Sequence, residues 1–538
     1  MAFGNFLVRK QKLNHFYMPS ERGFTCNMGE LVPIFAEEVM PGDVWKMKSM
    51  ALVRLQPMIA PIMHNINIFT HYFFVPYRLV HDNWEPFITG GEDGKDATPI
   101  PLVKSPDDGK GWQPGSVMDY LGYATGAPGF SAEAYFIRAY NLIYNDWYRN
   151  QNFIDEVSLS KGDGLDTTTS QQLLKRAWQA DYFTDCLPWA QRGDTINLPL
   201  GVSAPVQVMG NGKALGFSNG SHPTVISAGS SGAVWYSNPN NYNLGVVPGG
   251  TLDNGNYNRG VNVDPTLSGL TGIADLTDAT ATTVNDLRDA VQLQVAAEIA
   301  ARVGGRYVEY LLGNFGVRSA DSRLQRPEYL GGGRSSILVS QVLQTSSTDA
   351  TTPQGNMAGH GISVNSSHAF KKRFTEHGCI IGIMSIMPDT KYFQGSRRHF
   401  NRRSRLDFPV PVFSHLGEQQ VLEKEIFAQG DGKSTNIGGI SVSDETTFGF
   451  LPRYEEMRYI PSTIHGDFKD TLKFWTLARE FTQPPLLNAD FVNCNPSKRV
   501  FAVTDEAYDS CIVNIGFQTH AYRPLPKQGI PGYLDHLF

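Results

Sequence analysis

Charged residues are scarce in this chain of 538 residues, and its cysteines are few and scattered. Asp, Glu, Lys and Arg make up 18% of the sequence, against about 25% in typical soluble proteins. The five cysteines are an odd number, and no C-x-x-C pair occurs. This usage disfavours a disulfide scaffold and a thiolate zinc site, and it indicates a reducing compartment.

Long hydrophobic runs and an overall positive charge are also missing. The longest nearly apolar stretch, residues 378–388, is about half as long as a membrane-spanning helix. Residues 1–12 lack the apolar core of a secretory leader, so we expect no membrane insertion. Because the net charge is −6, the chain as a whole cannot wrap nucleic acid. Any contact with phosphate must come from local basic patches.

Aromatic residues, glycine and proline are, by contrast, abundant. Aromatics reach 11% of the chain, which also holds 53 Gly and 32 Pro. The glycine and proline content favours a mainly β protein with many loops. Few charges beside many aromatics predict that much of the folded surface is later covered by a partner. The length predicts several domains, or one domain with large insertions.

Two segments show how the predicted strands are buried. From Cys511 to Phe517, apolar residues alternate with more polar ones, which predicts a strand with one buried face. Residues 379–384 are apolar at both parities, which is typical of a strand covered on both sides. Further strands are predicted in residues 51–56 and 65–75, between prolines that bend or end them.

The middle of the chain has a different pattern. Aromatic and aliphatic residues recur at helical spacing within residues 131–150, and a second helix is predicted to begin after Thr283 and to end at Gly304. The apolar stripe of this second helix consists of Val284, Leu287, Val291, Val295 and Ile299. Residues 201–260 are rich in Gly, Asn and Ser and hold only three charges. They form either a flexible linker or, as we favour, an ordered insertion that projects into solvent.

Patterns that suggest catalysis fail on their context. Gly216 to Gly220 match the G-x-S-x-G nucleophile motif, but no helical pattern follows them. The chain has no H-E-x-x-H motif, no complete phosphate-binding loop and no calcium loop. The acidic pairs Glu37-Glu38 and Glu455-Glu456 would point to opposite faces of a strand, so they do not form a glycosidase pair. We expect no catalytic residue, no metal and no cofactor.

One basic cluster stands out. Five arginines lie within nine residues: Arg397, Arg398, Arg402, Arg403 and Arg405. A second basic group lies upstream: Lys371, Lys372 and Arg373. Arginine forks bind phosphate oxygens, and neighbouring aromatics stack on unpaired bases, so both groups are candidates for contact with nucleic acid. The alternatives are a solvated loop and ion pairs between subunits.

Six segments carry a resemblance to a known family. They are residues 31–35 (LVPIF), 41–43 (PGD), 72–79 (YFFVPYRL), 181–189 (DYFTDCLPW), 323–332 (RLQRPEYLGG) and 450–454 (FLPRY). The chain resembles the major capsid proteins of microviruses, and it is most similar to the gokushovirus branch of small tailless phages with circular single-stranded DNA. The resemblance spans nearly the whole chain.

This resemblance implies a structural protein with no catalytic residues. The implied fold is mainly β, an eight-stranded antiparallel jelly roll with long loop insertions that contain a few helices. Sixty copies would assemble through pentamers into a T=1 icosahedral shell around the genome. The implied location is the virion, and the host cytoplasm during assembly. Implied partners are an internal scaffolding protein, a DNA pilot protein, a small basic DNA-binding protein and a host surface receptor.

The resemblance also implies how the chain is divided. Residues 1–80 would form an N-terminal arm and the first strands, and residues 370–538 would form the remaining strands and a C-terminal arm. Between them, residues 81–200 would be an insertion with loops and a helix, and residues 201–282 a surface insertion that makes a threefold protrusion. Residues 283–369 would form a helix and inter-subunit loops. Candidate inter-subunit contacts are Trp84, Phe87, Leu324, Arg326, Tyr329, Tyr533 and Phe538. Candidate protrusion residues are Trp235, Tyr236 and Tyr242. The alternative function is a jelly-roll protein that binds or degrades glycans.

Overall fold

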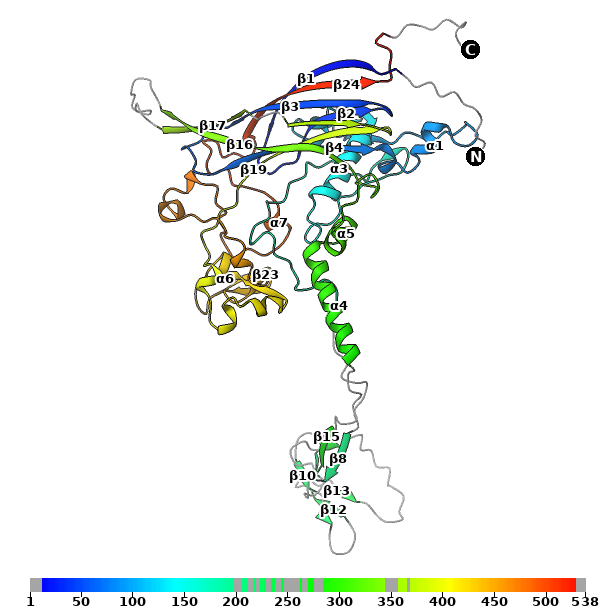
Figure 1. Cartoon of the computed structure of the whole chain (residues 1–538). Coiled ribbons are helices and arrows are strands. Elements are labelled where there is room, and N and C mark those ends of the chain that lie inside the picture. Colours follow the sequence, from blue (N-terminus) through cyan, green and yellow to red (C-terminus); the bar gives the residue numbers. More distant parts are fainter. Residues whose placement is uncertain are drawn as a thin grey trace. The chain divides into compact units, whose positions relative to one another are not determined.

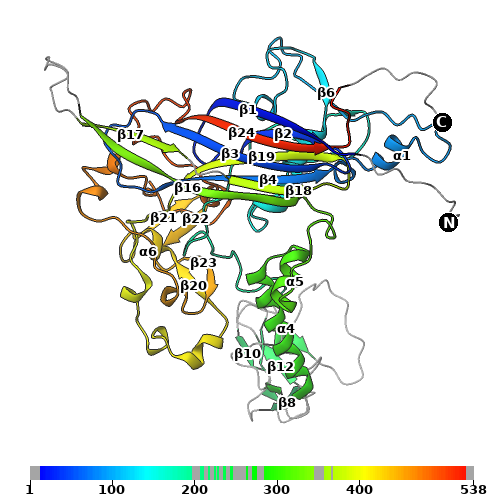
Figure 2. The same ribbon diagram turned by 45° about the horizontal axis from the view of Figure 1, so that its top comes forward.

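Nine strands form two antiparallel sheets that share one long strand (Figures 1 and 2). The computed structural model describes residues 12–194, 196, 206–210, 216–218, 223–225, 227–228, 234–237, 243–245, 262–263, 270–274, 284–343, 357–364 and 368–528. The chain divides into two units, residues 1–192 with 298–538 and residues 193–297. Both sheets belong to the first unit.

The first sheet is ordered β1 (Asn14–Cys26), β24 (Cys511–Arg523), β3 (Val44–Leu55), and then β17 (Met357–Val364) and β18 (His368–Arg373) in succession along β3. The second sheet is ordered β16 (Glu328–Leu343), β4 (Ile66–Pro76), β19 (Gly378–Pro388) and β2 (Val32–Val39). Strand β16 pairs with β4 through its first part and with β17 through its second part, so it links the two sheets.

This strand order is that of an eight-stranded jelly roll, and it confirms the predicted fold. When β17 and β18 are counted as one strand, the first sheet joins the first, eighth, third and sixth strands of the roll. The second sheet joins its second, seventh, fourth and fifth strands. The two ends of the roll pair along their full length, from Asn14 opposite Arg523 to Cys26 opposite Cys511.

The link between the sheets needs glycine at one point. The register of β16 on β4 shifts between Tyr329 and Gly331, and Gly331 has φ of 152°. A Cβ atom on the next residue, Gly332, would lie 2.1 Å from the carbonyl oxygen of Thr70. A side chain at Gly332 would therefore push β16 away from β4 at the bulge.

The inner faces of the two sheets meet in the main core. Strand β24 contributes Val513, Ile515 and Phe517, which are buried, while Ile512 and Asn514, of the opposite parity, are exposed. The alternation predicted for this strand is confirmed. Each fully buried aliphatic side chain contributes about 1.5–3 kcal/mol relative to exposure, so the inward parity fixes the strand register.

The second sheet also has a covered outer face. All eleven residues of β19 are buried, which confirms the prediction for this segment. Phe73, Cys379 and Ile381 pack there against helices α2 (Val117–Leu121) and α3 (Tyr135–Ile143). Figure 1 shows α3 on one side of these strands and the pair β1 and β24 on the opposite side. No helix of the described chain covers the outer face of β1 and β24 in the same way.

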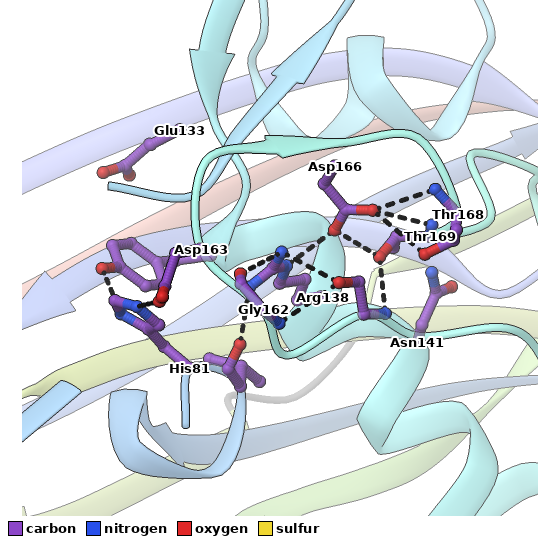
Figure 3. Close-up of polar contacts among 12 residues, drawn as sticks. His81, Glu133, Arg138, Asn141, Gly162, Asp163, Asp166, Thr168 and Thr169 are labelled. Atoms are coloured by element: carbon purple, nitrogen blue, oxygen red, sulfur yellow. Dashed lines mark hydrogen bonds and ion pairs between the residues drawn. The ribbon is translucent and has the colours of Figure 1, made fainter. Parts of the chain in front are cut away.

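A buried ion pair holds the loops that cover this outer face (Figure 3). The Nε atom of Arg138 on α3 donates to a carboxylate oxygen of Asp166 at 2.7 Å, and both side chains are fully buried. Arg138 also donates to the carbonyl oxygens of Val80 and Gly162, and Asp166 accepts from the hydroxyl of Thr169 at 2.6 Å. Every one of these groups is matched, as a buried charge requires.

Helix α3 begins later than the sequence pattern predicted. Residues Ser131–Glu133 form strand β6, which pairs with β5 (Leu102–Lys104), and the helix starts at Tyr135. A π-helical turn, Tyr144–Tyr148, extends α3. The predicted helix within residues 131–150 is confirmed, but its predicted start is four residues too early. Residues 131–133 pair with β5 through their backbone and so do not join the helix.

The remaining elements of the first unit are short. The strands are β7 (Leu165–Asp166), β20 (Glu418–Leu422), β21 (Ser434–Ile437), β22 (Ile440–Ser443) and β23 (Thr447–Pro452). The helices are α1 (Trp84–Thr89), α5 (Tyr307–Phe315), α6 (Glu423–Ile426) and α7 (Ala489–Val492). The 3-10 turns are η1 (Tyr77–Leu79), η3 (Arg398–Phe400), η4 (Arg405–Asp407), η5 (Pro411–His415), η6 (Glu455–Met457), η7 (Gly466–Lys469) and η8 (Lys473–Trp475).

The second unit contains small antiparallel sheets. Its strands are β8 (Val206–Gly210), β9 (Gly216–Ser218), β10 (Pro223–Val225), β11 (Ser227–Ala228), β12 (Val234–Ser237), β13 (Asn243–Gly245), β14 (Asn262–Val263) and β15 (Leu270–Ala274). They pair in the orders β10-β9-β14, β11-β12-β13 and β15-β8. Helix α4 (Val284–Val303) follows, and it confirms the helix predicted after Thr283.

Candidate nucleic-acid and assembly surfaces

The five predicted arginines lie on one loop that is built from short turns. Turn η3 contains Arg398, and turn η4 begins at Arg405. The carboxylate of Asp407 accepts hydrogen bonds from the backbone N–H groups of Arg403 and Ser404, at 2.8 and 2.7 Å. These bonds lower the pKa of Asp407, so it stays ionised and holds the turn.

Two of the arginines are used inside the chain. The Nη1 atom of Arg398 donates to Glu425 at 3.0 Å and to the carbonyl oxygen of Gln420 at 2.6 Å. Arg397 donates to the carbonyl oxygen of Pro461 at 3.0 Å. Burial raises the pKa of Glu425, and Arg398 partly offsets this effect. These contacts attach the loop to its own domain. The guanidinium of Arg398 is paired with a carboxylate, whereas that of Arg397 is held by a neutral carbonyl oxygen.

The other three arginines differ among themselves. Arg402 lies over the ring of Phe408 at 5.0 Å and 4.0 Å from the carboxylate of Glu456. Arg403 and Arg405 are exposed, and neither guanidinium forms an ion pair with any described residue. The cluster that looks uniform in sequence therefore offers two free cations, at Arg403 and Arg405.

A cavity of about 510 Å³ lies beside this loop. Its lining includes Tyr182, Arg397, Arg398, Glu425 and His465. Burial and the neighbouring Glu425 raise the pKa of Tyr182 well above its ordinary value. Since the cavity presents acidic and basic groups together, a phosphate placed there would meet Glu425 as well as the arginines.

The second predicted basic group lies on strand β18. Lys371, Lys372 and Arg373 are all exposed. Lys372 forms an ion pair with Glu328 at 2.7 Å. Lys371 stands opposite Lys46 of β3 in the register, so two lysines are neighbours on the outer face of the first sheet. This group is thus separate from the arginine loop and lies on a different element.

The predicted inter-subunit residues on α1 are partly used within the chain. Trp84 and Phe87 are half-buried and lie 5.8 Å apart, ring centre to ring centre. Trp84 also packs on Tyr77 at 4.9 Å. These contacts anchor α1 to the domain, and only part of each ring is left for a neighbour.

The predicted contact residues near the start of β16 are similar. Arg326 stacks on Trp147 at 3.9 Å and pairs with Asp321 at 3.1 Å. Leu324 is half-buried, and Tyr329 is 43% exposed. Tyr329 therefore offers the larger free surface.

The other predicted residues are placed only in part. Trp235 and Tyr236 lie on strand β12. Tyr242, Tyr533 and Phe538 lie outside the described residues.

An exposed apolar segment follows the arginines, and the sequence interpretation missed it. We call residues 406–416 the apolar loop. Phe408 is 55% exposed and Val412 is 76% exposed, and Phe400 nearby reaches 73%. The signal in the sequence is the run FPVPVF at 408–413, in which two prolines prevent regular strand pairing of an apolar stretch.

Helices α4 and α5 each expose large apolar side chains. Leu293 of α4 is 59% exposed, and Tyr307 and Phe315 of α5 are 64% and 65% exposed. The predicted stripe of α4 thus includes exposed residues such as Leu287 and Val291. Large apolar side chains left open in several places are a mark of surfaces that other proteins cover.

The described residues offer neither a metal site nor a membrane-spanning helix. No group of three or more His, Cys, Asp or Glu side chains there could hold a metal ion. No described helix has the length and apolar character to cross a bilayer. The five cysteines are free and buried. Burial raises the pKa of Cys186, Cys379 and Cys494, so these three are not activated thiolates.

Comparisons with known proteins give one consistent result. The family model described as "Capsid protein (F protein)" matches residues 11–533. The chain is 37% identical to "Capsid protein VP1" of Bdellovibrio phage phiMH2K, over 94% of this chain and 93% of that protein. It is 36% identical to the protein of the same name from Chlamydia phage 1, again over 94% and 93%. It is 31% identical to that of Spiroplasma virus 4, over 99% and 96%.

Proposed function

The chain belongs to the phage capsid protein (F protein) family, and from this premise we propose that sixty copies of it form a T=1 icosahedral shell around a circular single-stranded DNA genome. It is a major capsid protein and has a structural, non-enzymatic role. The alternative of a glycan-binding or glycan-degrading protein is therefore set aside.

The observation that carries the proposal is the set of separate apolar surfaces. The apolar loop, helices α4 and α5, and Tyr329 all expose large apolar side chains. A closed shell requires each subunit to bury several different surfaces around its symmetry axes. A monomer in solution would have no reason to keep all of them open.

The charge balance determines how the genome would be neutralised. With a net charge of −6 per chain, sixty copies add no positive charge to balance the phosphates. Counterions or a small basic protein would supply most of the neutralisation. We propose that Arg403 and Arg405 add local, sequence-independent contacts from the inside of the shell, because phosphate contacts carry no base information.

The remaining parts of the proposal follow the resemblance. Residues 201–282 would form a protrusion at the threefold axes and contribute to attachment to a host receptor. The C-terminal arm, from Pro524 onward, would dock on a neighbouring subunit. An internal scaffolding protein and a DNA pilot protein would act in assembly and delivery, and assembly would take place in the host cytoplasm before the protein resides in the virion.

Assembly is tested with the full-length protein by sedimentation and negative-stain electron microscopy. We expect pentamers and closed particles for the wild type. Val412→Asp should block particle formation, because it places a charge in the apolar loop, whereas Val412→Ile should not. Monomers at every concentration, in the wild type, would contradict the proposal. Equal assembly of both variants would remove the apolar loop from it.

Genome contact and host attachment need separate tests. Arg403→Ser with Arg405→Ser should lower DNA content per particle and leave thermal stability unchanged. Arg398→Ser should lower stability, because it removes the counter-charge of the buried Glu425. Deletion of residues 210–260 should leave assembly intact and reduce adsorption to host cells. Unchanged DNA content in the first variant, or loss of assembly in the deletion, would contradict the corresponding assignment.

A further inference from the structure

The outer face of the first sheet carries a row of side chains that the capsid fold does not require. In the register, Tyr17 of β1, His520 of β24, Lys46 of β3 and Lys371 of β18 stand next to one another across four strands. Tyr17, His520 and Lys46 alternate with more buried neighbours in their strands, and Lys371 follows the buried Phe370, so all four belong to the outward parity. A row of this kind crosses the sheet at right angles to the strands.

Four rings gather at one end of this row. His15 and His520 are stacked at 5.2 Å between centroids, and Tyr17 and His520 are stacked at 4.9 Å. Tyr522 lies 4.9 Å from His15. Tyr17 is 55% exposed and Tyr522 is 41% exposed. The rings support one another on the sheet and still present aromatic surface to solvent.

Cations occupy the other end of the row. Lys46, Lys48, Lys371 and Arg373 are exposed on β3 and β18, and none forms an ion pair with a described residue. Among the outward positions of β1, β24, β3 and β18, the single acidic side chain is Glu21, two outward positions along β1 from Tyr17. In a chain with a net charge of −6, this local excess of positive charge is not a property of the surface in general.

A shallow hollow of about 670 Å³ adjoins the row. Its lining includes Pro19, Lys48, Gln518 and Gly516, together with the one acidic side chain of this face, Glu21. No heavy atom lies within 4 Å of where a Cβ of Gly516 would be, so the hollow is open above this residue. The hollow is large enough to take a flat ring beside Lys48.

We propose that this basic sheet face, defined by His15, Tyr17, Lys46, Lys48, Lys371, Arg373, His520 and Tyr522, binds single-stranded DNA. The lysines and the arginine would contact phosphates, while Tyr17 and Tyr522 would stack on unpaired bases. Sheets that combine exposed aromatics with flanking cations bind single strands without sequence preference, since every base has a stacking face. A base pair within a duplex is already stacked and does not offer that face.

This choice of occupant follows from charge and from ring chemistry together. An acidic protein would match the cations but would leave the rings without a specific partner. A hydrophobic protein surface would match the rings and would bury four unpaired cations at high cost. The inference rests on the proposed enclosure of a single-stranded genome, and it adds a second contact surface, on an element separate from the arginine loop.

The test uses full-length protein and a fluorescently labelled 20-nucleotide single strand of mixed sequence, with binding measured by anisotropy at several salt concentrations. Lys46→Ala with Lys371→Ala should weaken binding and reduce the slope of log affinity against log salt by about 1.4, for two lost phosphate contacts. Tyr17→Leu should weaken binding about tenfold and leave that slope unchanged, because it removes stacking and no charge.

Controls separate this face from general attraction of charges. Lys95→Ala with Lys110→Ala removes two exposed lysines elsewhere and should leave affinity unchanged. The Tyr17→Leu change should not affect binding of the same sequence as a duplex. Equal losses on single strand and duplex, or no loss with either face variant, would overturn the proposal. Face variants that bind DNA normally and fail to assemble would assign the face to a subunit interface instead.

The result can be separated from that of the proposed function. Particles that enclose DNA, together with face variants that bind the single strand as tightly as the wild type, would contradict DNA binding by this face and support the proposed shell. Absence of particles under any condition, together with the expected loss of binding in the variants, would contradict the proposed shell and support DNA binding by this face.

Discussion

The two sheets of the jelly roll have strands of similar length and opposite surroundings. The second sheet is covered on both faces, by the first sheet and by α2 and α3, and its strand β19 is buried throughout. The first sheet is covered on its inner face, and no described helix packs on the outer face of β1 and β24. Burial on both faces makes the second sheet the more stabilising of the two, while the first sheet leaves one face open to solvent.

The largest effect is expected at the buried ion pair that holds the covering loops. Asp166→Asn leaves Arg138 fully buried without its counter-charge, and we expect the free energy of unfolding to fall by about 3–5 kcal/mol in urea titrations. Asp107→Asn, at the exposed pair with Lys104, should cost less than about 1 kcal/mol. Equal losses in the two variants would mean that the covering loops do not stabilise the second sheet.

A matched pair of isoleucines compares the sheets directly. Ile381 of β19 is fully buried under the helices, and Ile512 of β24 is 46% exposed on the bare face. Ile381→Ala should lower the free energy of unfolding by about 2–5 kcal/mol, and Ile512→Ala should change it by less than about 0.5 kcal/mol. A large loss at Ile512 in the isolated subunit would show that its face is already covered.

The smallest effect is a dependence on pH that only the covered side should show. Burial alone would raise the pKa of Asp166, but hydrogen bonds from Thr169 and the ion pair with Arg138 hold it below its ordinary value of 3.8. A lowered carboxyl pKa stabilises the fold fully above the unfolded value, and that stabilisation is lost as pH falls through the folded pKa. The stability gap between wild type and Asp166→Asn should therefore shrink between pH 7 and pH 3. A stability difference that stays constant over this pH range would contradict a lowered pKa of Asp166.

Strand burial could be predicted from the sequence because it determines how apolar and polar residues alternate along the strand. The alternation from Cys511 to Phe517 and the double-sided apolar run at 379–384 each predicted the observed surroundings. The start of α3 could not be predicted, since it depends on pairing between residues 131–133 and β5, which is not a local property. The pair Arg138 and Asp166 leaves no pattern either, because an arginine and an aspartate 28 positions apart occur in any chain.

The candidate sites were less predictable than the fold, for the same reason. Five arginines in nine residues look alike in sequence, yet Arg398 is taken by Glu425 and Arg397 by Pro461, which lie 27 and 64 positions away. The basic sheet face draws Tyr17, Lys46 and His520 from three strands that only the tertiary register brings together. Density of charge along the chain is therefore a poor guide to density of free charge on the surface.

The pairing of the first and last strands of the roll imposes a delay between the synthesis of β1 and its pairing with β24. Asn14 pairs with Arg523, which is synthesised 509 positions later. At a translation rate of about 5–20 residues per second, this synthesis takes roughly 25–100 s. Until then neither edge of β1 has a partner among the described strands, so nascent chains on neighbouring ribosomes could pair with it. Contacts of such long range also slow folding itself. Host chaperones that shield β1 during translation should therefore limit the yield of native subunits.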